Sequence, residues 1–168
     1  RSLGQFDFCC NECCLCCILI TGCNCIFELL LRLKANLYWP AMHNVSKAFF
    51  LVDGNREAAA KYGIYIGSSH CEPMASNANG EWNLRGEGRY DFINNKEKVL
   101  DFWTERLQDV AGQEIVYTLG MRGIHDGPME GVDHDDSKGQ RDALVEVLKT
   151  QRELLAEHVN PDLKAIPQ

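Results

Sequence analysis

The sequence predicts an α/β fold in which short parallel strands carry helices on their outer side. Short apolar runs alternate with longer amphipathic segments in the order strand, helix, strand, helix, strand, helix, which gives about three βα units. The longest polar loops follow strands, whereas the loops that follow helices are short. A dinucleotide-binding fold has little support, because no Gly-rich phosphate loop follows a strand.

The first part of the chain contains two helices, and a strand follows each of them. Apolar residues at helical spacing predict a helix over 27–37, and the run 35–40 predicts a short buried strand that its final proline ends. A second helix is expected over 54–62, with three alanines at its centre and Gly63 as its cap. The apolar run 64–67 predicts the next short strand.

The second part of the chain has the clearest periodicity. A helix that Asn94 or Asn95 caps is expected to reach about Val110 and to bury its aromatic face. The run 114–119 is the clearest strand, and 138–158 is the clearest helix.

Two long polar loops, 68–89 and 120–137, each come directly after a strand. The chemistry of barrel enzymes lies at this end of the strands, in the loops that follow them. Both loops are rich in His, Arg, Asp and Glu. The asymmetry between long loops after strands and short loops after helices therefore predicts a catalytic face.

Composition and charge exclude some partners. The chain has 168 residues and a formal net charge of −7, with a sequence pI near 5.2. Proteins that hold nucleic acid or anionic membranes are usually basic, so we expect neither partner. The chain does not begin with Met, and both of its ends look cut rather than natural.

The cysteines divide the chain into a leader, 1–25, and a folded part, 26–168. Eight of the nine cysteines lie between Cys9 and Cys25, and only Cys71 lies beyond them. The leader is open to three interpretations: a membrane or signal segment, a metal-binding or palmitoylated cluster, or residues foreign to the fold. We favour the last, because the paired cysteines lack the spacing of a zinc site and the apolar run is broken.

Loop 68–89 opens with a histidine and a carboxylate two residues apart. His70 and Glu72 come right after the strand 64–67, so both could reach a sugar, one as a hydrogen-bonding group and one as acid, base or orienting group. The alternative is a solvated loop in which a backbone carbonyl fixes the histidine.

Loop 120–137 opens with an arginine and an aspartate among glycines. Arg122 could hold a substrate carboxylate by a two-pronged hydrogen bond, and Asp126 could act as acid or base. A purely structural ion pair between Arg122 and Asp126 is the alternative. The later part of this loop is acidic, and its spacing matches no calcium loop, so we expect a solvated run before the helix. Its residues are Glu130, Asp133, His134, Asp135 and Asp136.

Aromatic side chains near the loops could stack on sugar rings. Trp39, Trp82 and Tyr90 are candidates, whereas Trp103 falls inside a helix and is expected in the core. Cys71 lacks the context of a catalytic cysteine, and we discount it as a nucleophile.

These motifs resemble those of glycoside hydrolase family 115. The run 30–42, LLRLKANLYWPAM, is similar to an LLRLKAN-YLWPAM segment of that family, with Leu37 and Tyr38 swapped. Three further runs look like the same barrel domain: 67–74, 94–103 and 118–127. The resemblance covers 27–168 and implies a partial (β/α)8 TIM-type barrel, since a complete one needs about 250 residues.

The resemblance also implies an activity. The family removes glucuronic acid, or its 4-O-methyl form, from α-1,2 linkages on xylan, with inversion, by two carboxylic groups and a water. It implies catalytic roles for Asp126 and Glu72 and substrate binding by His70, Arg122 and Trp39. It implies no cofactor and no metal. The expected partners are glucuronoxylan or its oligosaccharides outside the cell. The full-length enzyme could also form a homodimer.

The sequence departs from the family at one acid. Many members read Asp-Gly-Asp where this chain has 124–126, Ile-His-Asp, so only the final aspartate is kept. In the family, earlier and later segments supply further active-site residues. Two other hypotheses remain: an inactive truncated product, or a metal-dependent hydrolase that uses His70, Glu72, Asp126 and His134.

Overall fold

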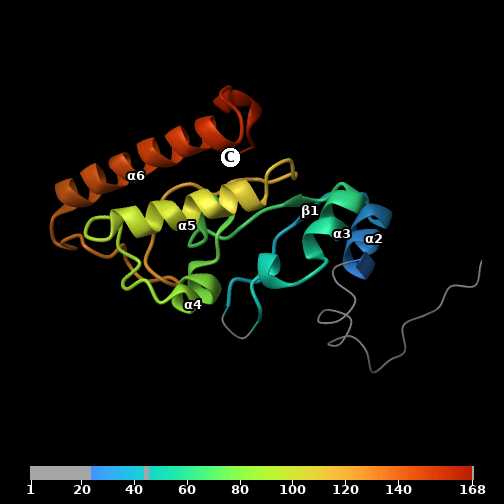
Figure 1. Cartoon of the computed structure of the whole chain (residues 1–168), viewed down its shortest axis with the longest axis horizontal. Helices are drawn as coiled ribbons and strands as arrows, with labels where there is room; N and C mark the ends of the chain where they lie inside the picture. Colours follow the sequence, from blue (N-terminus) through green and yellow to red (C-terminus); the bar gives the residue numbers. More distant parts are fainter. Residues whose placement is uncertain (1–23, 44–45, 168) are drawn as a thin grey trace, which may run out of the picture.

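The computed structural model describes residues 24–43 and 46–167, and it contains a small parallel sheet whose strand β1 lies near α3 (Figure 1). Strand β1 (Leu37–Tyr38) pairs with β2 (Tyr65–Ile66) so that Leu37 lies opposite Tyr65. A third segment joins the other edge of β2 through a parallel bridge between Ile66 and Ile115. The predicted parallel arrangement is therefore confirmed, although the strands are shorter than expected.

A helix follows each of the three strand segments, as the sequence predicts. Helix α3 follows β1, α5 follows β2, and α6 follows the bridge at Ile115. Helices α5 and α6 pack against each other and lie side by side in Figure 1, while α2 packs on α3 at the other end. The bounds of the four helices are α2 Asn24–Arg32, α3 Asn55–Tyr62, α5 Lys96–Asp109 and α6 Ser137–His158.

The helix ends show how local chemistry sets the boundaries. Gly63 ends α3 in the left-handed conformation at φ 62°, as expected. Asn95 is the N-cap residue of α5, as expected, but its side chain makes no capping hydrogen bond there. Its amide instead donates to the carbonyls of Glu87 and Arg89, because the preceding loop folds back onto it. Helix α6 begins after Asp136, whose carboxylate accepts from the backbone N–H of Lys138.

The first helix lies nearer the N-terminus than the apolar spacing suggests. Helix α2 begins at Asn24, inside the segment 1–25, and ends five residues before Leu37. Lys34 adopts φ 60°, a left-handed conformation that ends the helix before the chain extends into β1. The buried ring of Phe27 contacts the rings of Tyr38, Phe49 and Tyr62 and joins α2 to the core. The remainder of the cysteine-rich leader, 1–23, lies outside the described residues.

The segment 68–89 is not the solvated loop that its Gly, Asn and Ser content suggests. It folds into three short turns: η2 (Pro73–Ala75), the π-helical turn η3 (Ala78–Trp82) and α4 (Asn83–Arg85). Met74 and Trp82 are almost fully buried, so apolar side chains spaced between the polar ones form part of the core. This packing fixes the base of the loop that carries His70.

A buried ion pair ties this segment to α5. Arg106 donates to Glu81 at 2.6 Å and to Asp109 at 2.6 Å, and its guanidinium lies over the ring of Phe50. Burial raises the pKa of Glu81 even though Arg106 opposes the effect.

Among the described helices, none has the length and apolar character needed to cross a membrane.

Candidate functional site

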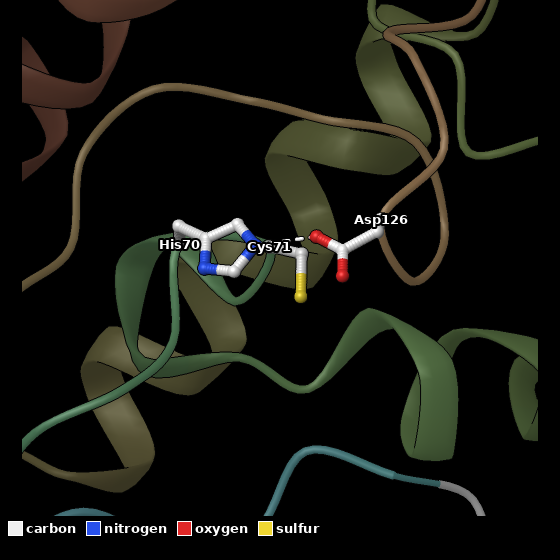
Figure 2. A group of neighbouring side chains, drawn as sticks. All are labelled: His70, Cys71 and Asp126. Carbon is white, nitrogen blue, oxygen red and sulfur yellow. Dashed lines mark hydrogen bonds and ion pairs between the residues drawn. The ribbon is translucent and has the colours of Figure 1, made fainter.

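The two loops that follow β2 and the Ile115 segment meet at a histidine and an aspartate (Figure 2). Nε2 of His70 contacts Oδ1 of Asp126. The two side chains are 56% and 57% exposed, so a ligand can reach both. The structure thus brings together two of the residues that the sequence predicts for the site.

The ends of the strands are joined by hydroxyl hydrogen bonds that hold the loops in place. Thr118 donates to the carbonyl of Ser68 at 2.8 Å, and Ser68 donates to the carbonyl of Glu72 at 2.9 Å. The backbone N–H of Met74 donates to the carbonyl of Thr118 at 3.0 Å. The Thr118–Ser68 and Met74–Thr118 bonds join the bases of the two loops, and the Ser68–Glu72 bond tightens the turn of the first loop. The two loops therefore start from positions that are hydrogen-bonded to each other.

Arg122 lies beside Asp126 on its own loop. Its guanidinium donates to the Asp126 carbonyl at 3.3 Å and approaches Oδ1 of the same residue at 3.5 Å. The ion pair that the sequence left as an alternative is therefore present, and half of the Arg122 side chain remains exposed. The hydrogen bond from His70, followed by the charges of His70 and Arg122, lowers the pKa of Asp126. Asp126 is accordingly a carboxylate at neutral pH.

Glu72 lies close by but faces inward. It is 5% exposed, and its Oε2 accepts from the backbone N–H of Ser69 at 2.9 Å. Burial raises the pKa of Glu72, while the Ser69 hydrogen bond lowers it in part. Glu72 lines a small, partly open hollow of about 20 Å³ together with Glu81 and Phe49. Glu72 therefore supports the turn that presents His70, and burial shifts its pKa in the opposite direction from that of Asp126.

Trp39 lies at a different place from the His70–Asp126 contact. It is 61% exposed and lines an open hollow of about 320 Å³ with Leu37, Gly67, Ser68 and residues 116–119. Ser68 and Thr118, whose hydrogen bonds join the bases of the two loops, thus also form part of this hollow. An exposed indole at a strand end is placed to contact an apolar sugar face.

Trp82 and Tyr90 do not stack on a ligand, so that prediction was wrong. They are 1% and 0% exposed and pack on each other with ring centroids 5.2 Å apart. The indole of Trp82 donates to the carbonyl of Gly88 at 2.8 Å, and Trp103 donates to the Tyr90 hydroxyl at 3.1 Å. Their polar atoms are satisfied inside the protein, which explains how such large rings are buried below a polar loop. Trp103 is in the core, as expected.

Sequence reasoning missed a group of sulfur-containing and histidine side chains around the site. The thiol of Cys71 donates to the thioether of Met42 at 3.1 Å. Nδ1 of His43 faces Nε2 of His125 at 3.3 Å, and His125 has a left-handed backbone at φ 64°. Met42 and His43 follow β1, so a third loop reaches the same place. The signal was present in the sequence, since this loop also follows a strand.

Acidic side chains in the later part of loop 120–137 bond to backbone N–H groups of the same segment or to a neighbouring arginine. Asp133 accepts from the backbone N–H of Asp135 at 2.9 Å, and Glu130 pairs with Arg89 at 2.7 Å. His134 lines a separate hollow of about 390 Å³ together with Arg89 and Glu130. In the part of the chain that the structure describes, the cluster with metal-ligand spacing is His70, Cys71 and Asp126. Two of the four residues of the metal-hydrolase hypothesis, His70 and Asp126, belong to this cluster, whereas Glu72 and His134 do not.

Comparison with known proteins places the chain in a family. The model of glycosyl hydrolase family 115 matches residues 22–168. A solved structure, described as the family GH115 4-O-methyl-α-glucuronidase BtGH115A with specificity for decorated arabinogalactans, is 58% identical to the chain, with a TM-score of 0.80. The match covers 85% of this chain and 19% of that one. A comparison with curated proteins gives no match. Because the family model spans most of the residues and the structural relative is this similar, the chain belongs to glycosyl hydrolase family 115.

Proposed function

We propose that the chain forms part of the active site of a glycoside hydrolase that removes glucuronic acid, or its 4-O-methyl form, from the side chains of xylan. The observation that carries the proposal is the exposed Asp126 carboxylate held between His70 and Arg122, at the mouth of two loops that follow parallel strands. A carboxylate, an imidazole that can donate a hydrogen bond and a half-exposed guanidinium are groups suited to an acidic sugar.

In this mechanism Asp126 is the base. Its pKa is lowered, so it is ionised at neutral pH and suited to take a proton from the attacking water. His70 donates to the carboxylate and fixes its orientation. An inverting reaction needs a second carboxyl, about 6.5–9.5 Å from the first, to protonate the leaving oxygen. Glu72 is the candidate for this acid, because burial raises its pKa.

Arg122 and Trp39 are proposed to bind the substrate. The Arg122 guanidinium contacts Asp126 only at 3.3 and 3.5 Å and is half exposed, so it can still pair with the carboxylate of a uronic acid. Trp39 supplies an exposed aromatic plane at the edge of the adjoining hollow. Together they would distinguish glucuronic acid from a neutral sugar and hold the ring beside the catalytic face.

The proposal concerns a larger enzyme than these residues. The chain spans about a fifth of the matched structure. We infer that further segments would complete a (β/α)8 barrel and supply the remaining binding residues. The same proposal places that enzyme outside the cell, where xylan is, and allows it to form a homodimer. It calls for no cofactor.

The experiment uses a family enzyme that carries this chain, incubated with glucuronoxylan and followed by proton NMR. We expect release of uronic acid from the α-linked side chains, with the β-anomer appearing first because the reaction inverts. Decorated arabinogalactan, the specificity that the structural relative's description gives, is tested in parallel.

Each outcome is decisive. Failure to release uronic acid from either polysaccharide contradicts the hydrolase function. Release from arabinogalactan alone moves the substrate from xylan to that glycan. Initial appearance of the α-anomer contradicts inversion while leaving the function in place.

A further inference from the structure

Cys71 is a buried thiol in the middle of the site that the proposed hydrolysis does not use. It is 3% exposed, and burial, followed by the charges of Glu72 and Asp126, raises the pKa of its thiol. Its hydrogen bond goes to the thioether of Met42, which is a weak acceptor. Replacing the thiol proton by a metal ion therefore sacrifices little hydrogen bonding in the folded chain.

The donor atoms of His70, Cys71 and Asp126 lie together. A ring nitrogen of His70, the Cys71 sulfur and a carboxylate oxygen of Asp126 all lie within 4.8 Å of one another. Figure 2 shows the Asp126 carboxylate facing the His70 ring, with Cys71 between and behind them. His70 and Cys71 are adjacent in sequence, whereas Asp126 comes from the other loop, so the cluster links both.

These separations suit a tetrahedral cation after small movements. Zinc binds histidine nitrogen at about 2.0 Å and thiolate sulfur at about 2.3 Å, which puts ligand atoms roughly 3.3–3.7 Å apart. The Cys71 side chain is fixed by burial, but His70 and Asp126 are exposed and can move by the ångström required. The imidazole and carboxylate, now in contact, would separate as the ion replaces the proton between them.

We propose that His70, Cys71 and Asp126 form a binding site for a thiophilic divalent cation of the zinc type, with three protein ligands and a fourth position open to solvent. A thiolate and a carboxylate balance the two charges of the ion, and a neutral imidazole completes a donor set that zinc favours over calcium or magnesium. Three ligands and an open position leave the ion reachable from the loop mouth.

The cation site does not depend on the proposed glycan hydrolysis, but both functions would use the side chains of His70 and Asp126. A metal on His70 and Asp126 occupies the base and its orienting partner, so zinc would inhibit the reaction rather than promote it. Arg122 opposes the ion, because its guanidinium lies 3.5 Å from the Asp126 carboxylate. Removing that positive charge should therefore tighten cation binding while weakening the binding of an acidic sugar.

The experiment titrates the chain with cadmium, a spectroscopic substitute for zinc, and records the ultraviolet charge-transfer band of a cadmium–thiolate bond. Serine replaces the other eight cysteines in the full chain, so that Cys71 is the only thiol. These positions are Cys9, Cys10, Cys13, Cys14, Cys16, Cys17, Cys23 and Cys25. Circular dichroism of every preparation checks that its helices are retained.

We expect one equivalent of cadmium to produce the band and zinc to displace it. Cys71→Ser should abolish the band, and His70→Ala and Asp126→Asn should each weaken binding by about tenfold or more. Arg122→Ala should tighten binding several-fold. His134→Asn is the matched control, since His134 lies in another hollow, and it should leave the affinity unchanged.

Absence of the band in a folded chain overturns the proposal. So does a band whose affinity His70→Ala and Asp126→Asn leave unchanged, because Cys71 would then bind cadmium alone. No glycan takes part in the titration, so failure of the proposed hydrolysis in a family enzyme would leave this result intact, and the two proposals can fail separately.

Discussion

His70 and Asp126 are 56 residues apart in sequence, yet Nε2 of one contacts Oδ1 of the other. The contact joins the loop after β2 to the loop after the Ile115 segment, which are neighbours because parallel strands place their carboxyl ends at one edge. It also lowers the pKa of Asp126 and so selects its charged form. The same contact therefore sets both the position and the protonation state of the carboxylate.

Replacing Asp126 by Asn should remove turnover while leaving the fold intact. The amide keeps the shape of the carboxylate but cannot accept a proton from water, so kcat should fall by about 10²–10⁴-fold in a family enzyme carrying the change. Asp126 is exposed, so thermal unfolding should shift little. Near-normal turnover in Asp126→Asn would mean that Asp126 is only the structural partner of Arg122.

Replacing Arg122 by Ala should affect acidic substrates selectively. The change leaves the carboxylate of a glucuronoside unpaired, so kcat/KM should drop by about 10–100-fold, mainly through KM. The methyl ester of the same uronoside is the matched comparison, because it has no charge for Arg122 to pair with. Equal losses for acid and ester would show that Arg122 acts through Asp126 rather than on the substrate.

Replacing Glu72 by Gln should change how stability depends on pH. Burial raises the folded-state pKa of Glu72 above its unfolded value of about 4.3. Between those two values the folded chain holds a proton that the unfolded chain has lost, so stability falls as pH rises through this window. The Gln variant lacks that proton and should lose this decline, while its amide oxygen still accepts from Ser69.

The measurement is the free energy of unfolding in urea, for wild type and Glu72→Gln, over a series of pH values from about 4 upward. Wild type should lose stability relative to the variant as pH increases. Parallel curves would refute the buried, raised-pKa carboxyl. Turnover adds a second distinction: loss of kcat in Glu72→Gln supports the acid role, whereas retained kcat with an unchanged fold leaves Glu72 as the residue that positions His70.

Much of the fold was predictable because local patterns decide it. Gly63 ends α3 and Asp136 begins α6 through short-range backbone chemistry, and periodicity alone identifies α5. The burial of the segment around Trp82 was not predictable. Its many Gly, Asn and Ser residues indicate an exposed loop, but its few apolar side chains pack into the core. Glu81 and Arg106, 25 residues apart, form a buried pair that only the packed structure reveals.

The order of the strands predicted which loops form the site, but not which side chains make contact within it. His70, Arg122 and Asp126 follow adjacent parallel strands, so their convergence needs no detailed coordinates. Cys71 has no sequence context that marks it, and its importance depends on a separation of a few ångströms from Asp126. Met42 approaches it from a third loop, and side-chain direction in such a loop has no periodicity to follow.

Trp39 and Trp82 form a matched pair that separates binding from stability. Trp39 is 61% exposed and Trp82 is 1% exposed, although both were candidates for stacking on a sugar ring and Trp39 alone was assigned to substrate binding. Trp82→Ala should destabilise the protein by about 3–5 kcal/mol, because it leaves a cavity beside Tyr90 and Phe102. Trp39→Ala should change stability by no more than about 0.5 kcal/mol. In a family enzyme it should instead raise KM for glucuronoxylan oligosaccharides, because it removes the aromatic plane at the hollow. Urea unfolding and steady-state kinetics on both variants test this directly, and an unchanged KM in Trp39→Ala would remove Trp39 from the binding site.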